Sequence, residues 1–523
     1  MTRLHIDRDL LDRELDGFSF PETFDFGAST SGYQVEGGFN GPDDPKNNWF
    51  GAEVRGEKAC TGPCARFLEN YGDALDRGAW IGLNAFRMGV EWARLQPATD
   101  PAATNPPPFS AAAARTYARI MAAAYDRGMF PAVTLHHFTN PLWAGLDLWL
   151  DWPKVREWFG AYVEFAVGAI NDALVGEFGK PPIPFFLTIN EPISSTMAGY
   201  LGGVFPTGGA KGLRPAMTCY ENLLLAHVLA YRTIHRIYRE RGWPRPTVTL
   251  NTWCAGIYGL DKIAPDLFLA RANGAARADI PTYVADQRAR FRAHVRRAPY
   301  VNGPRALKHV IDSVLDRLLQ RGFRPEPFSR LADFIYEGDE PRLIDVLAFD
   351  YYDPFPADNI DFSFPRLVRI GAQPYDWHFH PGVLRLFLES YSWTAGDLPI
   401  HIVEHGICHR FADGRAWPHP DGVGRDGALK EFLLEMVRGI REGRRVHSFY
   451  YWSLLDNYEW GSFEPRFGLF GVDYDNDARL LPTDIAGANA AGAYRLFVEA
   501  FRARDAALLR DAFLADRYPP FPR

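Results

Sequence analysis

Cysteine is scarce in this chain of 523 residues, and its pattern argues against a disulfide framework. The chain has five cysteines, an odd number, which suits reduced thiols better than paired ones. Two of them, Cys60 and Cys64, lie close together in "ACTGPC". No second pair of Cys or His at metal-ligand spacing accompanies them in the sequence, so we do not expect a structural zinc site.

Strong net charge and long apolar runs are also lacking. The net charge of −7 and the pI of about 6.1 argue against a general binder of nucleic acids. No run approaches the roughly 20 apolar residues that span a bilayer. The start, "MTRLHIDRDLLDRELDGFSF", lacks the uninterrupted apolar centre of a secretory signal. We therefore expect a cytoplasmic protein without nucleic-acid or membrane partners.

What the chain does have is a globular composition and eight short apolar runs. Hydrophobic residues make up 47% of the chain and charged residues 23%, as in ordinary globular proteins. Each run is too short for a typical helix and most are rich in β-branched or aromatic residues, so strands are predicted. The runs are "FDFGAST" from Phe24, "NAFRMGV" from Asn84, "FPAVTLHH" from Phe130, "PFFLTIN" from Pro184, "PTVTLNTW" from Pro246, "DVLAFDYY" from Asp345, "LPIHIVEHG" from Leu398 and "VHSFYYWSLLD" from Val446.

Helical stretches separate these runs, such as "AAAARTYARIMAAAYDRG", which ends at Gly128, and "YENLLLAHVLAYRTIHRIYRERG", which ends at Gly242. Alternating strands and helices favour a parallel sheet, and eight repeats favour its closure into a (β/α)8 TIM barrel of the α/β class. A doubly wound open sheet is the alternative, but no G-x-G-x-x-G follows the first run. Because about ninety residues separate the fifth and sixth runs, extra helices are expected over about 260–336, within a single domain of 1–523.

Polar residues gather where these runs end. In such a barrel the active site lies at the carboxyl end of the strands, so these residues should converge on one pocket. Two of them are carboxylates, Glu191 after the fourth run and Glu404 in the seventh. The others are hydrogen-bonding or aromatic side chains: Gln34, Arg87, His137, Asn190, Asp350, Tyr352, Trp452, Glu459 and Trp460.

Two facing carboxylates can perform several reactions. His137 and Asp350 could complete a metal site, so spacing alone leaves a metal-assisted hydrolase open. Sugar chemistry fits better, because aromatic faces stack on pyranose rings while polar side chains bind hydroxyls. Glycoside hydrolysis needs one carboxylic acid to protonate the leaving oxygen and one carboxylate to attack or assist at the anomeric carbon. Arg87 and Tyr352 would keep Glu404 ionised, whereas the glutamate of the fourth run, beside an uncharged amide, could carry the proton.

At these residues the chain resembles glycoside hydrolase family 1, the β-glucosidase family, from Phe24 to about Ala500. "FGASTSGYQVEGG" is similar to the amino-terminal signature of the family, "FRMGVEWARLQP" to its second-strand motif and "VTLHHFTNPLW" to its third. "LTINEP" matches the acid/base motif and "IVEHG" resembles the nucleophile motif. "YYWSLLDNYEW" with "RFGLFGVDY" is similar to the carboxyl-terminal signature.

The resemblance implies a retaining β-glycosidase without cofactor or metal, acting on a small-molecule β-glycoside. Unphosphorylated β-D-glucosides are the expected substrates, with β-galactosides and β-fucosides tolerated. By motif position, Glu191 would be the acid/base and Glu404 the nucleophile. Arg87 and Tyr352 would hold the nucleophile, and Asn190 would bind the 2-hydroxyl of the sugar. The remaining residues would line the sugar subsite: Gln34, His137, Trp452, Glu459 and Trp460.

Departures from the family motifs keep two alternatives open. His405 follows Glu404 where the family usually has Asn, and Asp350 stands where it usually has Asn. A carboxylate at Asp350 would raise the pKa of Glu404 unless Asp350 is protonated or paired, and His405 is a candidate partner. The altered surroundings of Glu404 leave a catalytically silent sugar-binding barrel possible. A 6-phospho-β-glycosidase is the other alternative, although phosphate-binding members of the family lack the pair formed here by Glu459 and Trp460.

Overall fold

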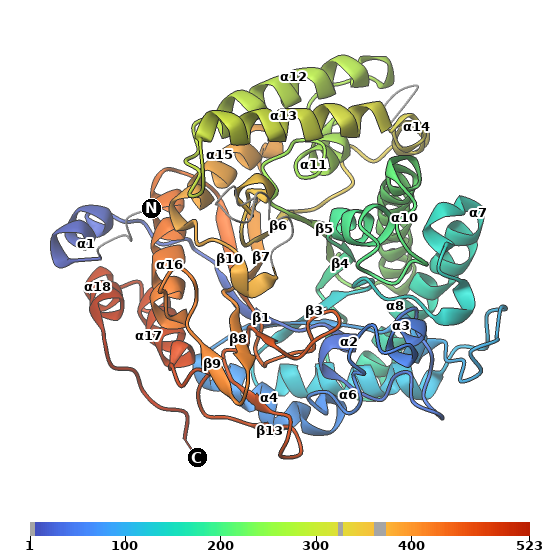
Figure 1. Cartoon of the computed structure of the whole chain (residues 1–523), viewed down its shortest axis with the longest axis horizontal. Helices are drawn as coiled ribbons and strands as arrows, with labels where there is room; N and C mark the ends of the chain where they lie inside the picture. The colour runs from blue at the N-terminus through green and yellow to red at the C-terminus, as the bar shows by residue number, and fades with distance from the viewer. Residues whose placement is uncertain (1–5, 323–327, 360–372, 523) are drawn as a thin grey trace.

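The centre of the molecule is a closed barrel of eight parallel strands (Figure 1). The computed structural model describes residues 6–322, 328–359 and 373–522. Each predicted run forms one strand, and neighbours around the barrel follow the order β1-β10-β7-β6-β5-β4-β3-β2. The predicted TIM barrel is therefore confirmed. Its strands are β1 (Asp25–Ser29), β2 (Ala85–Gly89), β3 (Phe130–Thr134), β4 (Phe185–Asn190), β5 (Thr247–Trp253), β6 (Leu347–Tyr351), β7 (Ile400–His405) and β10 (Val446–Trp452).

Both faces of these strands are covered, which explains why the runs are apolar throughout rather than alternating. A small hydrophobic cluster, which includes Ala132, Leu187 and Val403, is formed by barrel residues and is separate from the main core. The main core unites the other strand residues with the surrounding helices. Apolar side chains fill the interior of the barrel, so the polar residues of these runs are concentrated at the strand ends.

The helices that follow the strands surround the barrel (Figure 1). Ser110 caps the helix predicted to end at Gly128, its side chain accepting a hydrogen bond from the Ala113 N–H at 3.2 Å. The helix predicted to end at Gly242 does end there, in a left-handed conformation with φ of 65°, but it begins earlier than predicted, at Leu213. These helices are α4 (Phe67–Ile81), α6 (Ala111–Asp126), α8 (Gly160–Gly176), α10 (Leu213–Arg241), α15 (Leu384–Ala395), α16 (Arg425–Arg441) and α17 (Ala490–Arg502).

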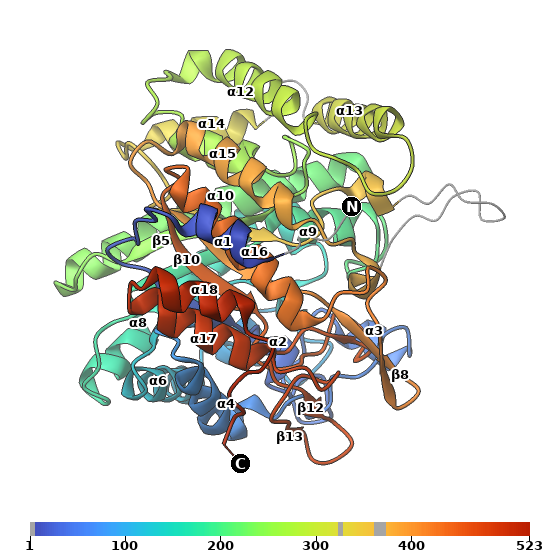
Figure 2. The same ribbon diagram turned by 90° about the vertical axis from the view of Figure 1, so that its left-hand side faces the viewer.

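Extra helices lie between β5 and β6, as the length of that connection predicts. Figures 1 and 2 show α12 and α13 at the outer edge of the molecule, above α15. Among the described residues, no helix has the length and apolarity needed to cross a membrane. The inserted helices are α11 (Ile263–Leu269), α12 (Ile280–Val295), α13 (Arg305–Gly322) and α14 (Ser329–Glu337).

Short elements extend the loops around the barrel and the chain ends. The sequence did not predict β8, β9, β11, β12 and β13, because strands of two to four residues carry no readable period. They form a three-stranded sheet in the order β11-β8-β9 and a two-stranded one, β12-β13. Their bounds, with those of the other short helices, are β8 (His409–Ala412), β9 (Arg415–Trp417), β11 (Pro465–Arg466), β12 (Val472–Asp473), β13 (Arg479–Leu480), α1 (Arg8–Leu15), α2 (Gly32–Val35), α3 (Phe50–Val54), α5 (Trp92–Leu95), α7 (Trp152–Lys154), α9 (Pro192–Ser194) and α18 (Ala506–Leu514).

Candidate active site

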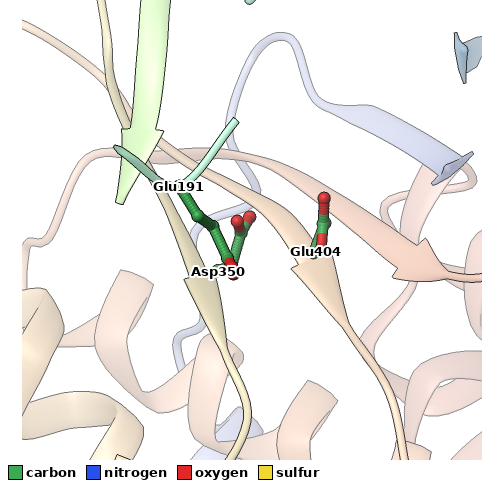
Figure 3. Close-up of side chains that lie close together, drawn as sticks. All are labelled: Glu191, Asp350 and Glu404. Atoms are coloured by element: carbon green, nitrogen blue, oxygen red, sulfur yellow. The ribbon is translucent and has the colours of Figure 1, made fainter. Parts of the chain in front are cut away.

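Three carboxyl groups meet at the carboxyl end of the barrel (Figure 3). Glu191 follows β4, Asp350 lies in β6, and Glu404 lies opposite Asp350 in the neighbouring strand β7. One carboxyl oxygen of each residue lies within 4.8 Å of the other two, and all three residues are buried. The two carboxylates that the sequence singled out therefore face one pocket, and a third one joins them.

Glu191 is positioned by a tight turn at the end of β4. Its backbone has φ of 35°, in the left-handed region, and Pro192 begins α9 directly after it. A proline disfavours the helical conformation in the residue before it, so the chain turns here instead of continuing as a helix through Glu191. Ser194 Oγ donates a hydrogen bond to Glu191 Oε2 at 2.6 Å. The turn and this hydrogen bond together hold the carboxyl group over the pocket.

Glu404 is held by the two groups that the sequence predicted. Arg87 Nη1 donates to Glu404 Oε1 at 2.6 Å, and the Tyr352 hydroxyl donates to Oε2 at 2.9 Å. Burial raises the pKa of Glu404, whereas the charge of Arg87 and the hydrogen bonds from both partners lower it, for a net upward shift. Both oxygens of Glu404 are thus fixed by donors that favour the ionised form.

Arg87 also fixes Asn190 through a network that the sequence did not predict. Its Nη2 donates to Asn190 Oδ1 at 2.5 Å, and its Nε donates to Thr134 Oγ1 at 3.0 Å. Asn251 Nδ2 donates to the same Asn190 oxygen at 2.7 Å. Because two donors occupy this oxygen, the amide nitrogen is the other polar end of Asn190, and it lies 3.5 Å from His137 Nε2.

The environments of Glu191 and Glu404 differ in the way that acid/base chemistry requires. Burial raises the pKa of Glu191 to about 7, and the negative charge of Glu404 adds to this shift. Glu404 has Arg87 as a direct partner, whereas Glu191 has a serine hydroxyl. Two nearby carboxyl groups with different partners separate their protonation states, so Glu191 holds a proton more readily than Glu404 does.

An aromatic wall lies beside these carboxyl groups. The ring of His137 stacks nearly parallel to Trp452, with centroids 5.5 Å apart, and to Trp460, with centroids 5.8 Å apart. Burial lowers the pKa of His137 well below its usual value, and the charge of Arg87 lowers it further. The imidazole is therefore neutral and can both donate and accept hydrogen bonds.

Glu459 forms the polar corner next to this wall. Its Oε2 accepts hydrogen bonds from Gln34 Nε2 at 3.0 Å and from Asn457 Nδ2 at 2.8 Å. Burial raises the pKa of Glu459 to about 8, with smaller contributions from the charges of Glu404 and Glu191. These charge interactions place Glu459 close to Glu191 and Glu404, so it belongs to the same group of buried polar side chains.

One suggested contact is wrong. His405 does not pair with Asp350, because its Nδ1 bonds the carbonyl oxygen of Tyr351 at 2.9 Å. Its ring packs on Phe432, with centroids 3.7 Å apart. As alternate residues of a strand point to opposite faces, His405 lies on the face opposite to that of Glu404 and packs among the helices outside the barrel.

The sequence also missed the residues that support the site. Thr134, Ser194, Asn251 and Asn457 each donate to or accept from a predicted site residue. The one feature of the sequence that could have indicated these supporting residues is their position at a strand end or within a few residues of a carboxylate. The five cysteines are all free thiols, as predicted.

Metal binding at the three carboxyl groups would meet competition. The spacing of Glu191, Asp350 and Glu404 would admit a cation. Both oxygens of Glu404, however, already accept hydrogen bonds from Arg87 and Tyr352. A cation would have to displace or repel the guanidinium, so this donor set fits a proton better than a metal ion.

Comparison with known proteins defines the class. The chain belongs to glycosyl hydrolase family 1, whose model matches residues 17–269 and 366–482. It is accordingly a glycoside hydrolase of the β-glycosidase type. This agrees with the resemblance seen in the motifs.

Particular relatives come from plants, archaea and bacteria. "Beta-glucosidase 42" of Arabidopsis thaliana is 26% identical over 483 residues, covering 88% of this chain and 90% of that protein. A "Beta-galactosidase" of Sulfolobus acidocaldarius is 26% identical over 514 residues, covering 87% and 91%. The fold is similar to that of a β-glucosidase from Thermotoga maritima solved with noeuromycin, with a TM-score of 0.64, 19% identity, and coverage of 92% and 99%.

Proposed function

We propose that this enzyme is a retaining β-glycosidase that hydrolyses terminal, unphosphorylated β-D-glucosides. The observation that carries the proposal is the closeness of Glu191 and Glu404, whose nearest carboxyl oxygens lie within 4.8 Å. Retaining glycosidases hold their two carboxyl groups about 5 to 5.5 Å apart, whereas inverting enzymes need roughly 6.5 to 9.5 Å for an intervening water. A nearest oxygen pair within 4.8 Å fits the closer of these two arrangements and so supports direct attack by one carboxylate.

In the first step, Glu404 attacks the anomeric carbon as the bond to the aglycone oxygen breaks. Glu191 gives its proton to that oxygen, and a glycosyl ester forms on Glu404. In the second step, Glu191 is a carboxylate and takes a proton from water, whose oxygen attacks the anomeric carbon and releases Glu404. Two inversions at one carbon leave the product in the β configuration.

The surroundings of the carboxylates supply the positioning for these steps. Arg87 and Tyr352 keep Glu404 ionised and orient it. The amide nitrogen of Asn190 is available to a sugar 2-hydroxyl, since its oxygen is already occupied. Hydrogen bonds to that hydroxyl that strengthen in the transition state contribute several kcal/mol in such enzymes.

Substrate preference rests on the polar corner and the aromatic wall. Gln34 and Glu459 can bind adjacent hydroxyls, and Trp452 and Trp460 offer apolar faces to a pyranose ring. Because the relatives include proteins named for glucosidase and for galactosidase activity, we propose that β-galactosides and β-fucosides are also accepted. A 6-phosphate would meet the carboxyl group of Glu459, which disfavours phosphorylated sugars.

A silent sugar-binding barrel is the weaker candidate. Its motivation was the altered residue after Glu404, but His405 lies on the opposite face of β7 and does not touch the nucleophile. The intact contacts of Arg87 and Tyr352 with Glu404 favour an active enzyme.

The stereochemistry of the first-formed product tests the proposal. An aryl β-glucoside is mixed with the enzyme and followed by proton NMR before mutarotation. We expect the β anomer to appear first, and no product with Glu404→Gln. Initial release of the α anomer would overturn the retaining mechanism, and the absence of hydrolysis across a panel of aryl β-glycosides would favour the silent barrel.

A further inference from the structure

Asp350 is a third carboxyl group beside the catalytic pair. It is fully buried, and one of its oxygens lies within 4.8 Å of an oxygen of Glu191 and of Glu404, the three side chains labelled in Figure 3. Asp350 Oδ2 accepts a hydrogen bond from Asn251 Nδ2. Asp350 Oδ1 receives no hydrogen bond from a conventional donor in the described part of the chain. The carboxyl group of Glu191 is its neighbour: one oxygen of each lies within 4.8 Å of the other, and the interaction between the two groups lowers the pKa of Glu191 and raises that of Asp350.

Two carboxylate oxygens that face each other in a buried pocket repel, because both are acceptors. The contact becomes a hydrogen bond when one of the two carries a proton. With no other donor for Asp350 Oδ1 in the described structure, a shared proton also removes the cost of a buried unpaired acceptor. The geometry therefore favours a proton between Asp350 and Glu191.

The charges around Asp350 support the same conclusion. Ionisable groups interact with it from several strands of the barrel: Glu404 from β7, Glu191 after β4, Cys254 after β5, Tyr352 after its own strand β6, and Arg87 from β2. Among these described groups the one cation is Arg87, and its guanidinium contacts Glu404 and Asn190. Three ionised carboxylates beside one guanidinium would leave a double negative charge in a buried site.

We propose that Asp350 stays protonated and donates a hydrogen bond from its carboxyl group to Glu191, acting as a positioning residue for the acid/base. The catalytic meaning of this contact rests on the proposed function. Asp350 carries the proton because it is 0% exposed and lies directly opposite Glu404 in the strand register, whereas Glu191 is 8% exposed. Ser194 also donates to Glu191 and favours its anion. Burial, with the charges of Glu404 and Glu191, raises the pKa of Asp350 well above its usual value.

This hydrogen bond has two consequences for the reaction. It holds the Glu191 carboxyl group next to Glu404, in the place where it must reach the leaving oxygen. It also stabilises the Glu191 carboxylate after the proton has gone to the aglycone, while the Asp350 proton stays in place through both steps. A neutral Asp350 also avoids placing another negative charge beside Glu404, which would raise the pKa of Glu404.

The first test compares Asp350→Leu, of similar size but without a donor, with Asp350→Asn, which keeps a neutral donor. We expect Asp350→Leu to lower kcat about ten- to a hundredfold, the range for losing a hydrogen bond to a charged group, and to move the alkaline limb of kcat/KM to higher pH. Asp350→Asn should rescue most of this loss, with its alkaline limb within about half a pH unit of the wild type. An alkaline limb moved about one unit or more to lower pH in Asp350→Asn would show that Asp350 is ionised. Equal loss in both variants would exclude the donor role.

The second test needs no activity. Infrared difference spectra of wild type minus Asp350→Asn at neutral pH should contain the band of a protonated carboxyl group. The matched control, exposed Asp43→Asn, should give carboxylate bands instead. Carboxylate bands from Asp350 would overturn the proposal. This test does not use Asp350→Leu, so it holds even if that variant fails to fold. If the wild type hydrolyses no β-glycoside, the proposed function fails while the infrared result still decides the protonation of Asp350.

Discussion

Ionisable side chains lie at both ends of the barrel, but at one end they are paired with opposite charges and at the other most are not. At the carboxyl end, several carboxyl groups are buried beside one guanidinium, that of Arg87. At the amino end, before β5 and β6, a cavity of about 580 Å³ is lined mainly by cationic side chains. There Arg232 pairs with Glu340 at 3.1 Å, and Arg245 pairs with Asp345 at 2.8 Å.

The pKa values follow this difference. Burial raises the pKa of Glu191 to about 7 and that of Glu459 to about 8, since neither has a cation as direct partner. Burial would also raise the pKa of Asp345, but hydrogen bonds from His235 and Arg245 lower it below its usual value. Charges at the amino end are paired, whereas the crowded carboxyl groups at the carboxyl end have the perturbed pKa values that are typical of functional sites. A large cavity with matched charges is therefore a poorer guide to chemistry than a compact site with unmatched ones.

The largest effect should come from Glu404. If Glu404 is the nucleophile, as proposed, replacing it with Ala removes the attacking group, so kcat should fall by about 10⁴-fold or more for every aryl glycoside, whatever its leaving group. Steady-state rates across leaving groups of different pKa check this, with exposed Glu57→Gln as the control. A loss that shrinks with better leaving groups would contradict the role of Glu404 as nucleophile.

Replacing Glu191 with Ala should instead give losses that depend on the leaving group. Sugar or alkyl aglycones need the acid and should lose about 10² to 10⁴-fold, whereas an aryl group of low pKa should leave with a modest loss. The covalent intermediate should then accumulate, and azide, which needs no base, should restore turnover and yield a β-glycosyl azide. Product analysis decides the assignment: an α-azide, or azide rescue only in the Glu404 variant, would mean that the two roles are exchanged.

Glu459→Gln should have an intermediate effect. Gln34 and Asn457 both donate to Oε2 of Glu459, so the amide oxygen of the variant would stay with them, and its nitrogen would replace the acceptor that a sugar hydroxyl needs. We expect kcat/KM on aryl β-glucosides to fall about ten- to a hundredfold. Equal kcat/KM for wild type and variant would remove Glu459 from the subsite.

The pH dependence should show the separated protonation states. Glu191 must be protonated to act as an acid, so kcat/KM should fall as the pH rises through about 7. Glu404 must be ionised, so activity should also fall at acid pH, below the raised pKa of that group. A pH profile of the wild type on one aryl glucoside measures both limbs, and in Glu191→Ala the alkaline limb should disappear. A wild-type rate that stays constant well above pH 7 would contradict the assignment.

The smallest effect on activity should come from the amino end. Asp345→Asn should leave kcat within about twofold but lower the free energy of unfolding by about 1 to 3 kcal/mol, because Asp345 accepts a charge-assisted hydrogen bond from Arg245. The folded-state pKa of Asp345 is depressed, so its contribution is present above the unfolded-state pKa and lost as the pH falls through the folded-state value. Denaturant melts at neutral and acid pH check this. A large loss of activity in Asp345→Asn would contradict the conclusion that the amino end contributes to stability and not to catalysis.

Much of the site was visible in the sequence because strand ends are local features. The run that ends in Asn190 and Glu191 and the one that contains Glu404 could be identified from composition and length, and the barrel rule placed their ends together. Asp350 was also visible as an unusual charge. Its surroundings were not, since the sequence suggested His405 as a partner, and only the structure shows that His405 lies on the opposite face of its strand.

By itself, the sequence determined the eight strands, their alternation with helices and the carboxylates at the ends of two of them, because each depends on a few neighbouring residues. Only the tertiary structure decided which side chains meet. Gln34 and Glu459 are 425 positions apart, Arg87 and Glu404 are 317 apart, and Asn251 and Asp350 are 99 apart. Protonation is set by burial and by these distant contacts, and neither exists until the barrel closes.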